Sequence, residues 1–168
     1  AVILKVEDGN PVVYIGNSPP GRQAARNGYE PSSGADAGID YADAYWVDCA
    51  TAPRSSGSIL KPFLYAMMLE SGELTPGRLV PDIPTRIGSY SPENSKKTYS
   101  GAVRADEALA RSLNVPFVRL LRSYGIERFA SSLKRLGFTT LHREPADYGL
   151  TLILGGAEVT LLEAARAY

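Results

Sequence analysis

A helix predicted over residues 58–71 is the feature that most constrains the fold of this chain. Six large apolar side chains are distributed almost all round it, namely Ile59, Leu60, Phe63, Leu64, Met67 and Met68. A helix of this kind must be buried on most sides, so other elements have to surround it. Pro62 lacks an amide and would clash with the carbonyl of Ser58, so the helix must start close to Ser58, and Gly72 is placed as its C-terminal cap.

Length and composition exclude several classes of protein. The 168 residues are 44% hydrophobic and 21% charged, which is typical of one globular domain rather than of a disordered or fibrous chain. Lys plus Arg and Asp plus Glu are equal at 18 each, so we expect no nucleic acid as a partner. One His and one Cys are too few for a structural metal site, so we expect no metal and no cofactor, and Cys49 is interpreted as a buried apolar residue.

The chain is predicted to have three regions. Residues 1–16 contain a strand pair, over 2–6 and 12–15, joined by a turn with Asp8-Gly9. Residues 17–50 are rich in Gly, Pro, Ser and Asn and are predicted to be a loop-rich excursion. Residues 51–168 are predicted to be mainly helical.

Within this helical region, further helices are expected at 104–111, 117–124 and 126–136, while the apolar run 150–154 fits either a strand or a helix end. A capping box at Thr160–Glu163 predicts one more helix, with no stop signal before Tyr168. Since the chain also starts without Met, we expect it to be a piece of a longer protein.

Ser58 and Lys61 stand three residues apart at the start of the apolar helix. Positions i and i+3 share one helix face, so the Lys61 nitrogen can reach the Ser58 hydroxyl. Burial lowers the pKa of a lysine and lets its neutral amine act as a base, while a helix N-terminus offers free amides to a developing negative charge. The pair therefore predicts a serine-lysine acyl-transfer site.

The same spacing occurs again at Ser131 and Lys134. This second pair lies in the middle of the predicted helix 126–136, away from its apolar stripe, and we interpret both residues as solvated surface residues. Spacing alone does not distinguish the two kinds of site.

Ser112 and Asn114 form the only Ser-x-Asn motif of the chain, just before Val115-Pro116. Because a residue before proline is displaced from helical geometry, we expect Asn114 at a helix-to-loop corner from which polar side chains project. Taken alone, the pair is interpreted as a helix cap.

Three motifs taken together, Gly57–Phe63, Tyr90–Asn94 and Ala108–Pro116, resemble in order and spacing the transpeptidase domain of class A penicillin-binding proteins. The resemblance is good from about residue 52 to residue 168 and includes the opening strand pair. It implies an α+β fold, the penicillin-binding and serine β-lactamase-like fold, with an antiparallel sheet and surrounding helices. Residues 1–168 would be an incomplete fragment of one such domain.

The resemblance implies three catalytic residues and one substrate-binding residue. Ser58 would attack the penultimate D-alanine carbonyl of a peptidoglycan stem peptide, and an amine of a neighbouring stem would take the acyl group. Lys61 would be the base, Ser112 would relay a proton towards the leaving amine, and Asn114 would bind the substrate amide. A β-lactam would acylate the same serine.

Two alternatives stay open beside this D,D-transpeptidase. The same fold could hydrolyse its acyl-enzyme, as a D,D-carboxypeptidase or β-lactamase does, or it could serve as a non-catalytic penicillin-sensing or structural module. The third motif of the family, Lys-Thr or Lys-Ser followed by Gly on a strand, is absent, and the resemblance places it beyond Tyr168. The fragment alone is therefore expected to be inactive, because that strand supplies an oxyanion donor.

The resemblance also implies where the whole protein works. It predicts the periplasmic side of the bacterial inner membrane, with a membrane anchor and a glycosyltransferase domain outside this chain. The expected partners are peptidoglycan stem peptides, β-lactam antibiotics and cell-wall synthesis proteins.

The chain departs from the family pattern at Ser56, where the resemblance leads us to expect proline in many members.

Overall fold

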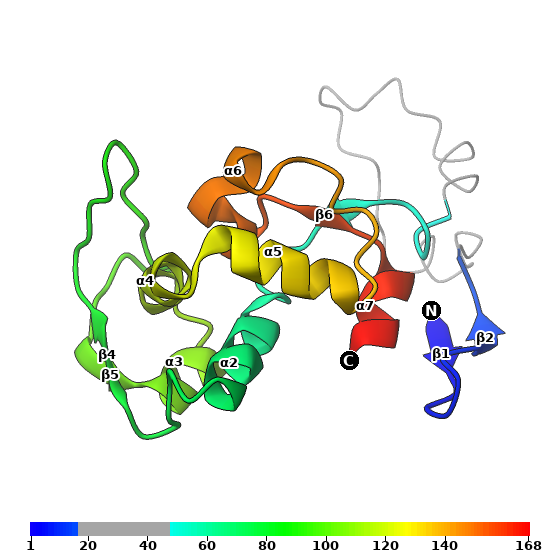
Figure 1. Cartoon of the computed structure of the whole chain (residues 1–168), viewed down its shortest axis with the longest axis horizontal. Coiled ribbons are helices and arrows are strands. Elements are labelled where there is room, and N and C mark those ends of the chain that lie inside the picture. Colours follow the sequence, from blue (N-terminus) through cyan, green and yellow to red (C-terminus); the bar gives the residue numbers. More distant parts are fainter. Residues whose placement is uncertain (17–47) are drawn as a thin grey trace, which may run out of the picture. The chain divides into compact units, whose positions relative to one another are not determined.

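A computed structural model describes residues 1–16 and 48–168, which form two compact units (Figure 1). The smaller unit is drawn from residues 1–53 and 159–168, and the larger unit comprises residues 54–158. The loop-rich segment predicted for residues 17–50 falls almost entirely on residues 17–47, which lie outside the described residues.

The smaller unit contains the predicted strand pair and a helix. Strands β1 (Val2–Leu4) and β2 (Pro11–Tyr14) are antiparallel, with Ile3 opposite Val13. Helix α7 (Leu161–Ala167) starts with the predicted capping box, in which the Thr160 hydroxyl accepts the Glu163 amide at 3.0 Å and the Glu163 carboxylate accepts the Thr160 amide at 3.0 Å.

Cys49 lies in the smaller unit and is exposed, so the expectation of a buried residue is wrong. The chain makes a turn here, closed by a hydrogen bond from the Ala52 amide to the Asp48 carbonyl at 2.8 Å. The next residue, Ala50, takes the buried position with only 1% of its surface exposed.

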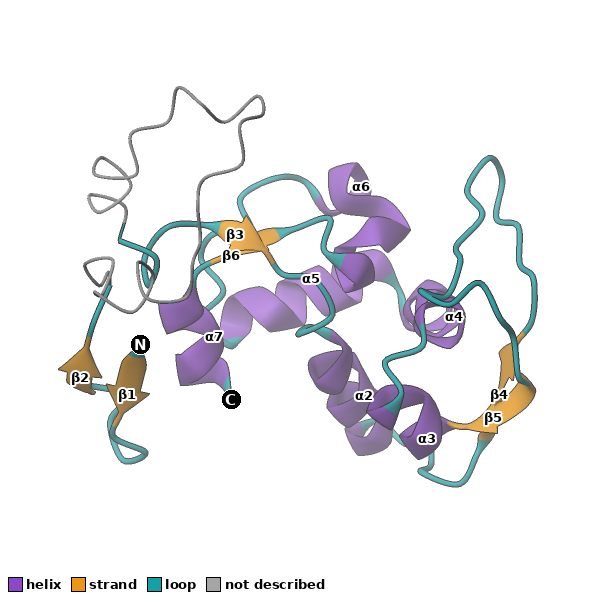
Figure 2. Cartoon of the chain, turned by 180° about the vertical axis from the view of Figure 1, so that it is seen from behind, coloured by secondary structure: helices purple, strands orange, loops and turns teal. Residues whose placement is uncertain are grey.

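Helix α4 (Asn114–Tyr124) is the central element of the larger unit (Figure 2). It contacts α2 (Lys61–Glu70), α3 (Ala105–Ala110), α5 (Ile126–Arg135) and the 3-10 helix η2 (Gly149–Leu154). Its buried residues cover most of its circumference: Val115, Pro116, Phe117, Val118, Leu120, Leu121 and Tyr124. The core of this unit is therefore built around α4.

Helix α2 is less enclosed than the sequence predicts. It buries Phe63, Leu64 and Met68, but Ile59 in the preceding turn is 38% exposed. The helix also begins at Lys61, three residues after the predicted start. Pro62 has no amide to donate to the Ser58 carbonyl, and the Lys61 amide donates to it instead at 3.1 Å, so residues 57–60 form a tight turn before the helix.

The junction of α3 and α4 also differs from its prediction. Asn114 is the first residue of α4 rather than part of a loop, and Pro116 lies in the first helical turn. A proline is tolerated there because the amide it lacks has no partner within the helix. Ser112, with φ of 51°, and the extended Leu113 turn the chain instead.

Strands β4 (Leu79–Asp82) and β5 (Gly101–Arg104) pair antiparallel, with Asp82 opposite Gly101. The connection between them, residues 83–100, contains turns and an isolated Ile87–Tyr90 bridge but no helix. Two further strands, β3 (Arg54–Ser55) and β6 (Glu158–Val159), form a two-stranded pair.

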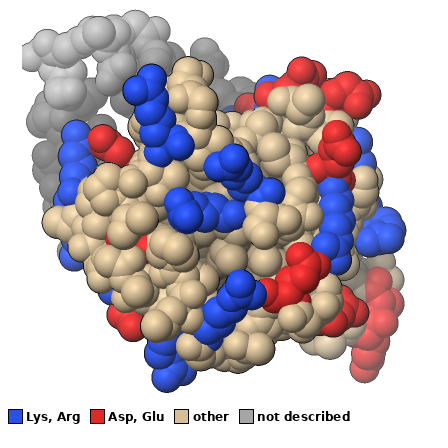
Figure 3. Space-filling model, turned by 60° about the vertical axis from the view of Figure 1, so that its left-hand side comes forward, with Lys and Arg blue, Asp and Glu red and all other residues tan. Residues whose placement is uncertain are grey.

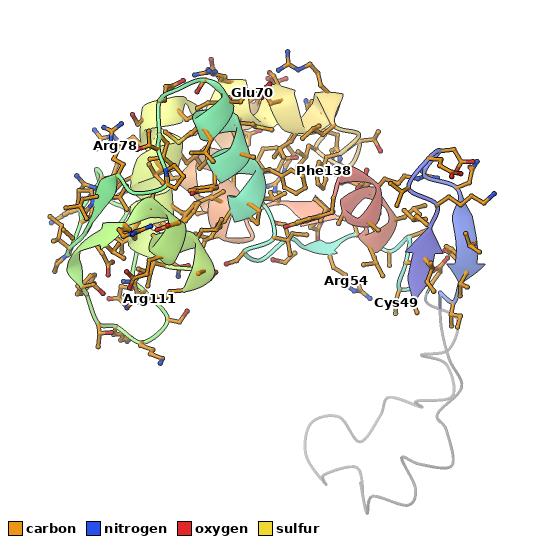
Figure 4. All side chains as sticks on the ribbon, turned by 90° about the horizontal axis from the view of Figure 1, so that it is seen from below. Cys49, Arg54, Glu70, Arg78, Arg111 and Phe138 are labelled. Atoms are coloured by element: carbon orange, nitrogen blue, oxygen red, sulfur yellow. The ribbon has the colours of Figure 1, made fainter. Side chains whose placement is uncertain are left out.

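Helix α6 (Pro145–Tyr148) precedes η2, which settles the ambiguous run 150–154 as 3-10 helix. The Phe63 and Phe138 rings meet edge to face, with centroids 5.5 Å apart; Phe138 is labelled in Figure 4. No helix in the described part of the chain is long and apolar enough to span a bilayer.

Basic and acidic side chains are interspersed over the face shown in Figure 3. The ion pairs found among residues 1–16 and 48–168 join exposed side chains, as in Arg111 with Glu107 and Arg128 with Glu73. Exposed pairs of this kind contribute about 0–1 kcal/mol each. The stability of the larger unit therefore depends mainly on its apolar core.

Candidate active site

Lys61 lies at the centre of a polar cluster in the larger unit and is only 1% exposed. Its Nζ donates to the Ser112 carbonyl at 2.8 Å, to Asn114 Oδ1 at 2.8 Å and to Ser112 Oγ at 3.3 Å. Lys61 opens α2, whereas Ser112 and Asn114 belong to the junction of α3 and α4. The structure thus brings together three of the four predicted site residues across about fifty positions of sequence.

Burial lowers the pKa of Lys61 to about 8. Lys61 forms no ion pair with any residue of the described segments, and its Nζ lies 5.8 Å from the centre of the Phe117 ring. Of its three partners, the Ser112 carbonyl and Asn114 Oδ1 can only accept hydrogen bonds. A neutral Lys61 therefore donates both N–H bonds to these oxygens and keeps its lone pair for a hydroxyl.

Ser58, the fourth predicted site residue, lies in the turn just before α2 and is half-buried. Its hydroxyl has no hydrogen-bond partner among the residues that the structure describes, so the predicted contact with Lys61 Nζ is not formed here. The Ser58 backbone amide is likewise unpaired within residues 1–16 and 48–168, and is available to an oxygen of a ligand.

The turn that carries Ser58 packs against Gly155. Ser55 Oγ donates to the Gly155 carbonyl at 2.8 Å. A Cβ at position 155 would lie 2.6 Å from Ser55 Oγ and 3.0 Å from Gly57 Cα, and the φ of Gly155 is +106°. Only glycine fits this position, because both the space and the backbone angle exclude a side chain.

Ser112 is held in a left-handed conformation that costs a residue with a Cβ about 1 kcal/mol. This conformation directs both its carbonyl and its hydroxyl to Lys61. Asn114 is fixed from the other side, because its Nδ2 donates to the Glu93 carbonyl at 2.9 Å. With Nδ2 engaged there, Oδ1 must face Lys61.

A cavity of about 300 Å³ adjoins Ser112. Its other lining residues are mainly polar, namely Asn94, Ser95, Lys96, Thr98, Arg111 and Leu113. Arg111, labelled in Figure 4 beyond the end of α3, donates to Glu107 Oε1 at 2.9 Å and to Ser100 Oγ at 3.0 Å. Ser112 is the one predicted site residue that lines this mainly polar cavity.

Two buried polar residues, Asp82 and Asn94, were given no role by the sequence prediction. They are 0% and 5% exposed, and an Asn94 Nδ2 to Asp82 Oδ1 hydrogen bond of 2.7 Å joins them. One local signal could have identified Asp82. In β4, buried and exposed positions alternate, and Asp82 occupies a buried position of that pattern, where an apolar residue is usual.

The second Ser-x-x-Lys pair differs from the first. Ser131 and Lys134 are both exposed on α5, which confirms their interpretation as surface residues. The described residues also contain no group of three or more His, Cys, Asp or Glu side chains that could hold a metal ion.

A family model described as "Penicillin binding protein transpeptidase domain" matches residues 1–165. The chain belongs to this family. It is 43% identical over 122 residues to penicillin-binding protein 1C of Escherichia coli strain K12, covering 73% of this chain and 16% of that protein. It is also 34% identical over 140 residues to penicillin-binding protein 1A of the same strain, covering 78% of this chain and 16% of that protein.

Solved structures agree with this assignment to the penicillin-binding proteins. The crystal structure of penicillin-binding protein 1A from Haemophilus influenzae matches 73% of this chain and 19% of that one, with a TM-score of 0.62 and 35% identity. The PonA1 protein of Mycobacterium tuberculosis in complex with penicillin V matches 72% of this chain and 35% of that one, with a TM-score of 0.62 at 24% identity, and supports the fold alone.

The predicted family and fold class are thereby confirmed. The chain is part of the transpeptidase domain of a class A penicillin-binding protein, an α+β fragment with small sheets and helices. The chain spans about 16% of the length of the two Escherichia coli relatives.

Proposed function

We propose that the protein containing this chain is a peptidoglycan D,D-transpeptidase that works through a serine acyl-enzyme. One observation carries the proposal. Lys61 is buried and has no ion-pair partner in the described segments, and its Nζ donates to two oxygens that can only accept hydrogen bonds. The lone pair of the neutral amine is therefore left for a hydroxyl. These are the requirements of a general base that activates a serine.

In the acylation step, Ser58 Oγ attacks the carbonyl carbon of the penultimate D-alanine of a stem peptide and passes its proton to Lys61. The Ser58 amide donates to the resulting oxyanion, with a second donor expected from the Lys-Thr/Ser-Gly strand of the family. The bond to the terminal D-alanine nitrogen then breaks, and the proton reaches that nitrogen through the Ser112 hydroxyl. Asn114 orients the stem peptide by hydrogen-bonding its amide.

In the second step, an amine of a neighbouring stem peptide attacks the ester carbonyl of Ser58. Its proton returns through the same groups to Ser58 Oγ, and a new amide bond cross-links the two stems. A β-lactam acylates Ser58 by the same chemistry, because its strained amide presents an equivalent carbonyl. This fits the matched PonA1 structure, which is a complex with penicillin V.

The proposed activity places this domain on the periplasmic side of the bacterial inner membrane, where peptidoglycan is built. A membrane anchor, a glycosyltransferase domain and contacts with other cell-wall synthesis proteins belong to this proposal for the whole protein.

Fluorescent penicillin labelling of the full-length protein tests the nucleophile. We expect one adduct, located on Ser58 by peptide mass spectrometry, and no adduct in Ser58→Ala. Ser131→Ala is the matched control and should label like the wild type. Labelling that persists in Ser58→Ala would refute the proposal.

The lifetime of the adduct tests the fate of the acyl group. We expect the penicilloyl-enzyme to be hydrolysed far more slowly than it forms. This is the behaviour of an enzyme that transfers acyl groups to amines rather than to water. Rapid turnover of the penicillin would instead indicate a β-lactamase of the same fold.

A further inference from the structure

The Asn94 side chain is fully hydrogen-bonded inside the larger unit. Its Oδ1 accepts the backbone amides of Asn114 at 2.9 Å and of Val115 at 3.2 Å. Its Nδ2 donates to Asp82 Oδ1 at 2.7 Å and to the Thr98 carbonyl at 2.9 Å. Both hydrogens and both lone pairs of this amide are therefore engaged, although the residue belongs to the connection between β4 and β5.

Asp82 determines which way the Asn94 amide points. Its carboxylate is fully buried, and its second oxygen accepts the Ser100 amide at 2.8 Å. Both Asp82 oxygens accept hydrogen bonds from N–H groups, so it is the NH₂ group of Asn94 that faces Asp82. Oδ1 is consequently directed at the first two amides of α4, which have no partner within the helix.

The connection between β4 and β5 holds Asn114 at two points. Asn94 Oδ1 accepts the Asn114 backbone amide, and the Glu93 carbonyl accepts the Asn114 side-chain Nδ2 at 2.9 Å. The remaining polar atom of that side chain, Oδ1, accepts from Lys61 Nζ at 2.8 Å. A continuous chain of hydrogen bonds thus runs from Asp82 through Asn94 and Asn114 to Lys61.

We propose that Asn94, oriented by Asp82, is a positioning residue that holds Asn114 against Lys61 during acylation. This inference rests on the proposed function, since it concerns the same site. A displacement of about 1 Å in a reacting group can slow a reaction about a hundredfold. Loss of the Asn94 contacts should therefore act on the acylation step more than on the binding that precedes it.

Two single substitutions and their combination test the proposal in the full-length protein. In Asn94→Asp, the second carboxylate oxygen faces Asp82 and the Thr98 carbonyl, and this repulsion displaces the connection. In Asp82→Asn, one acceptor oxygen is replaced by an NH₂ group, so residue 82 can no longer accept from both Asn94 Nδ2 and the Ser100 amide. In the double variant, the amide at position 82 can donate to the carboxylate at position 94 and still accept from Ser100, so most of the arrangement returns.

The readout is β-lactam acylation measured by stopped flow, which separates the dissociation constant of the first complex from the acylation rate constant. We expect each single variant to acylate about 10- to 100-fold more slowly, with less than about a threefold change in the dissociation constant. The double variant should recover at least about fivefold over the slower single variant. Asn10→Asp, the same change in the exposed β1–β2 turn, should acylate like the wild type.

Acylation within about twofold of wild type in either folded single variant would overturn the inference. A double variant whose losses simply multiply would also overturn it, because that result indicates two independent structural defects. If Asn94→Asp does not fold, a double variant that acylates faster than Asp82→Asn supports the inference, and one that acylates no faster than Asp82→Asn overturns it.

The Ser58→Ala variant separates a failure of this inference from a failure of the proposed function. An adduct in Ser58→Ala would refute the proposed function itself. An adduct that depends on Ser58 but is formed normally by folded Asn94 and Asp82 variants would leave the function standing and refute only the role of Asn94.

Discussion

The chain contains two Ser-x-x-Lys pairs, and they differ in their surroundings. Lys61 is 1% exposed and contacts Ser112 and Asn114 from the α3–α4 junction, whereas Lys134 is exposed on α5. Both pairs have the same spacing, but Ser58 lies in the turn before α2 whereas Ser131 lies within α5. The difference shows that spacing alone does not make a site, and that burial and partners from other segments distinguish Lys61.

Removing each lysine amine should give the largest contrast between the pairs. We expect Lys61→Gln to slow β-lactam acylation of the full-length protein by about 10²–10⁴-fold, because a general base is lost. Lys134→Gln should acylate at the wild-type rate. Equal rates for both variants would mean that burial does not make Lys61 a base.

The pH dependence of acylation tests the protonation of Lys61 directly. With a pKa of about 8, Lys61 is mostly protonated at neutral pH, so the acylation rate should rise with pH and level off above 8. At pH 6 the rate should be about a hundredth of that plateau. A rate that is independent of pH between 6 and 9 would contradict the assignment.

The lowered pKa of Lys61 also predicts how the free energy of unfolding changes with pH. The folded-state pKa of Lys61, about 8, lies below its ordinary value of 10.5, so the unfolded chain binds more protons between these pH values. The contribution of Lys61 to the free energy of unfolding therefore increases as the pH rises from about 8 to 10.5. Comparing urea unfolding of wild type and Lys61→Gln across this range isolates the effect.

Glycine and alanine substitutions should have opposite effects at the two motifs. Ser112 has a positive φ, so Ser112→Gly should be more stable than Ser112→Ala by about 1 kcal/mol. Ser131 lies inside α5, so Ser131→Gly should be less stable than Ser131→Ala by about 1 kcal/mol. Thermal unfolding measures both differences, and the same sign at both positions would contradict the left-handed conformation of Ser112.

The smallest contrast concerns two buried serines near the motifs. The Ser56 hydroxyl has no hydrogen-bond partner in the described part of the chain, whereas Ser132 Oγ accepts from Arg135 at 3.0 Å. Ser56→Ala should therefore leave the free energy of unfolding unchanged or raise it by up to about 1 kcal/mol, and Ser132→Ala should lower it by about 1 kcal/mol.

A proline at position 56 should be less favourable than alanine here. The Ser56 amide donates to the Ala157 carbonyl at 2.8 Å, and proline cannot make this bond. A Ser56→Pro variant that unfolds at a higher temperature than Ser56→Ala would show that this hydrogen bond contributes little.

Local patterns in the sequence predict most elements and much of the site. Apolar periodicity predicts α5, Asp8-Gly9 predicts the strand pair, and the capping box predicts α7, because each depends on residues close in sequence. The proline rules are less successful. Pro62 moves the start of α2 to Lys61, and Pro116 is accommodated inside α4, since the cost of a proline depends on which amides are already unpaired.

Contacts between distant segments could not be predicted in this way. Lys61 reaches the Ser112 carbonyl and not Ser58 because Ser112 adopts a left-handed backbone, which its sequence neighbours do not require. The hydrogen bonds of Asp82 and Asn94 depend on how a long connection returns to the start of α4. Such contacts follow from the packing of the whole unit rather than from any local pattern.

Gly155 links two parts of the chain that are almost a hundred residues apart. Because it leaves no room for a side chain behind Gly57, the shape of the turn before α2 and the identity of residue 155 cannot vary independently. Any larger residue at 155 would push the backbone of that turn forward and change the approach of a substrate to Ser58 without touching the substrate. A substitution at position 155 can thus displace Ser58 although it removes no polar group of the site.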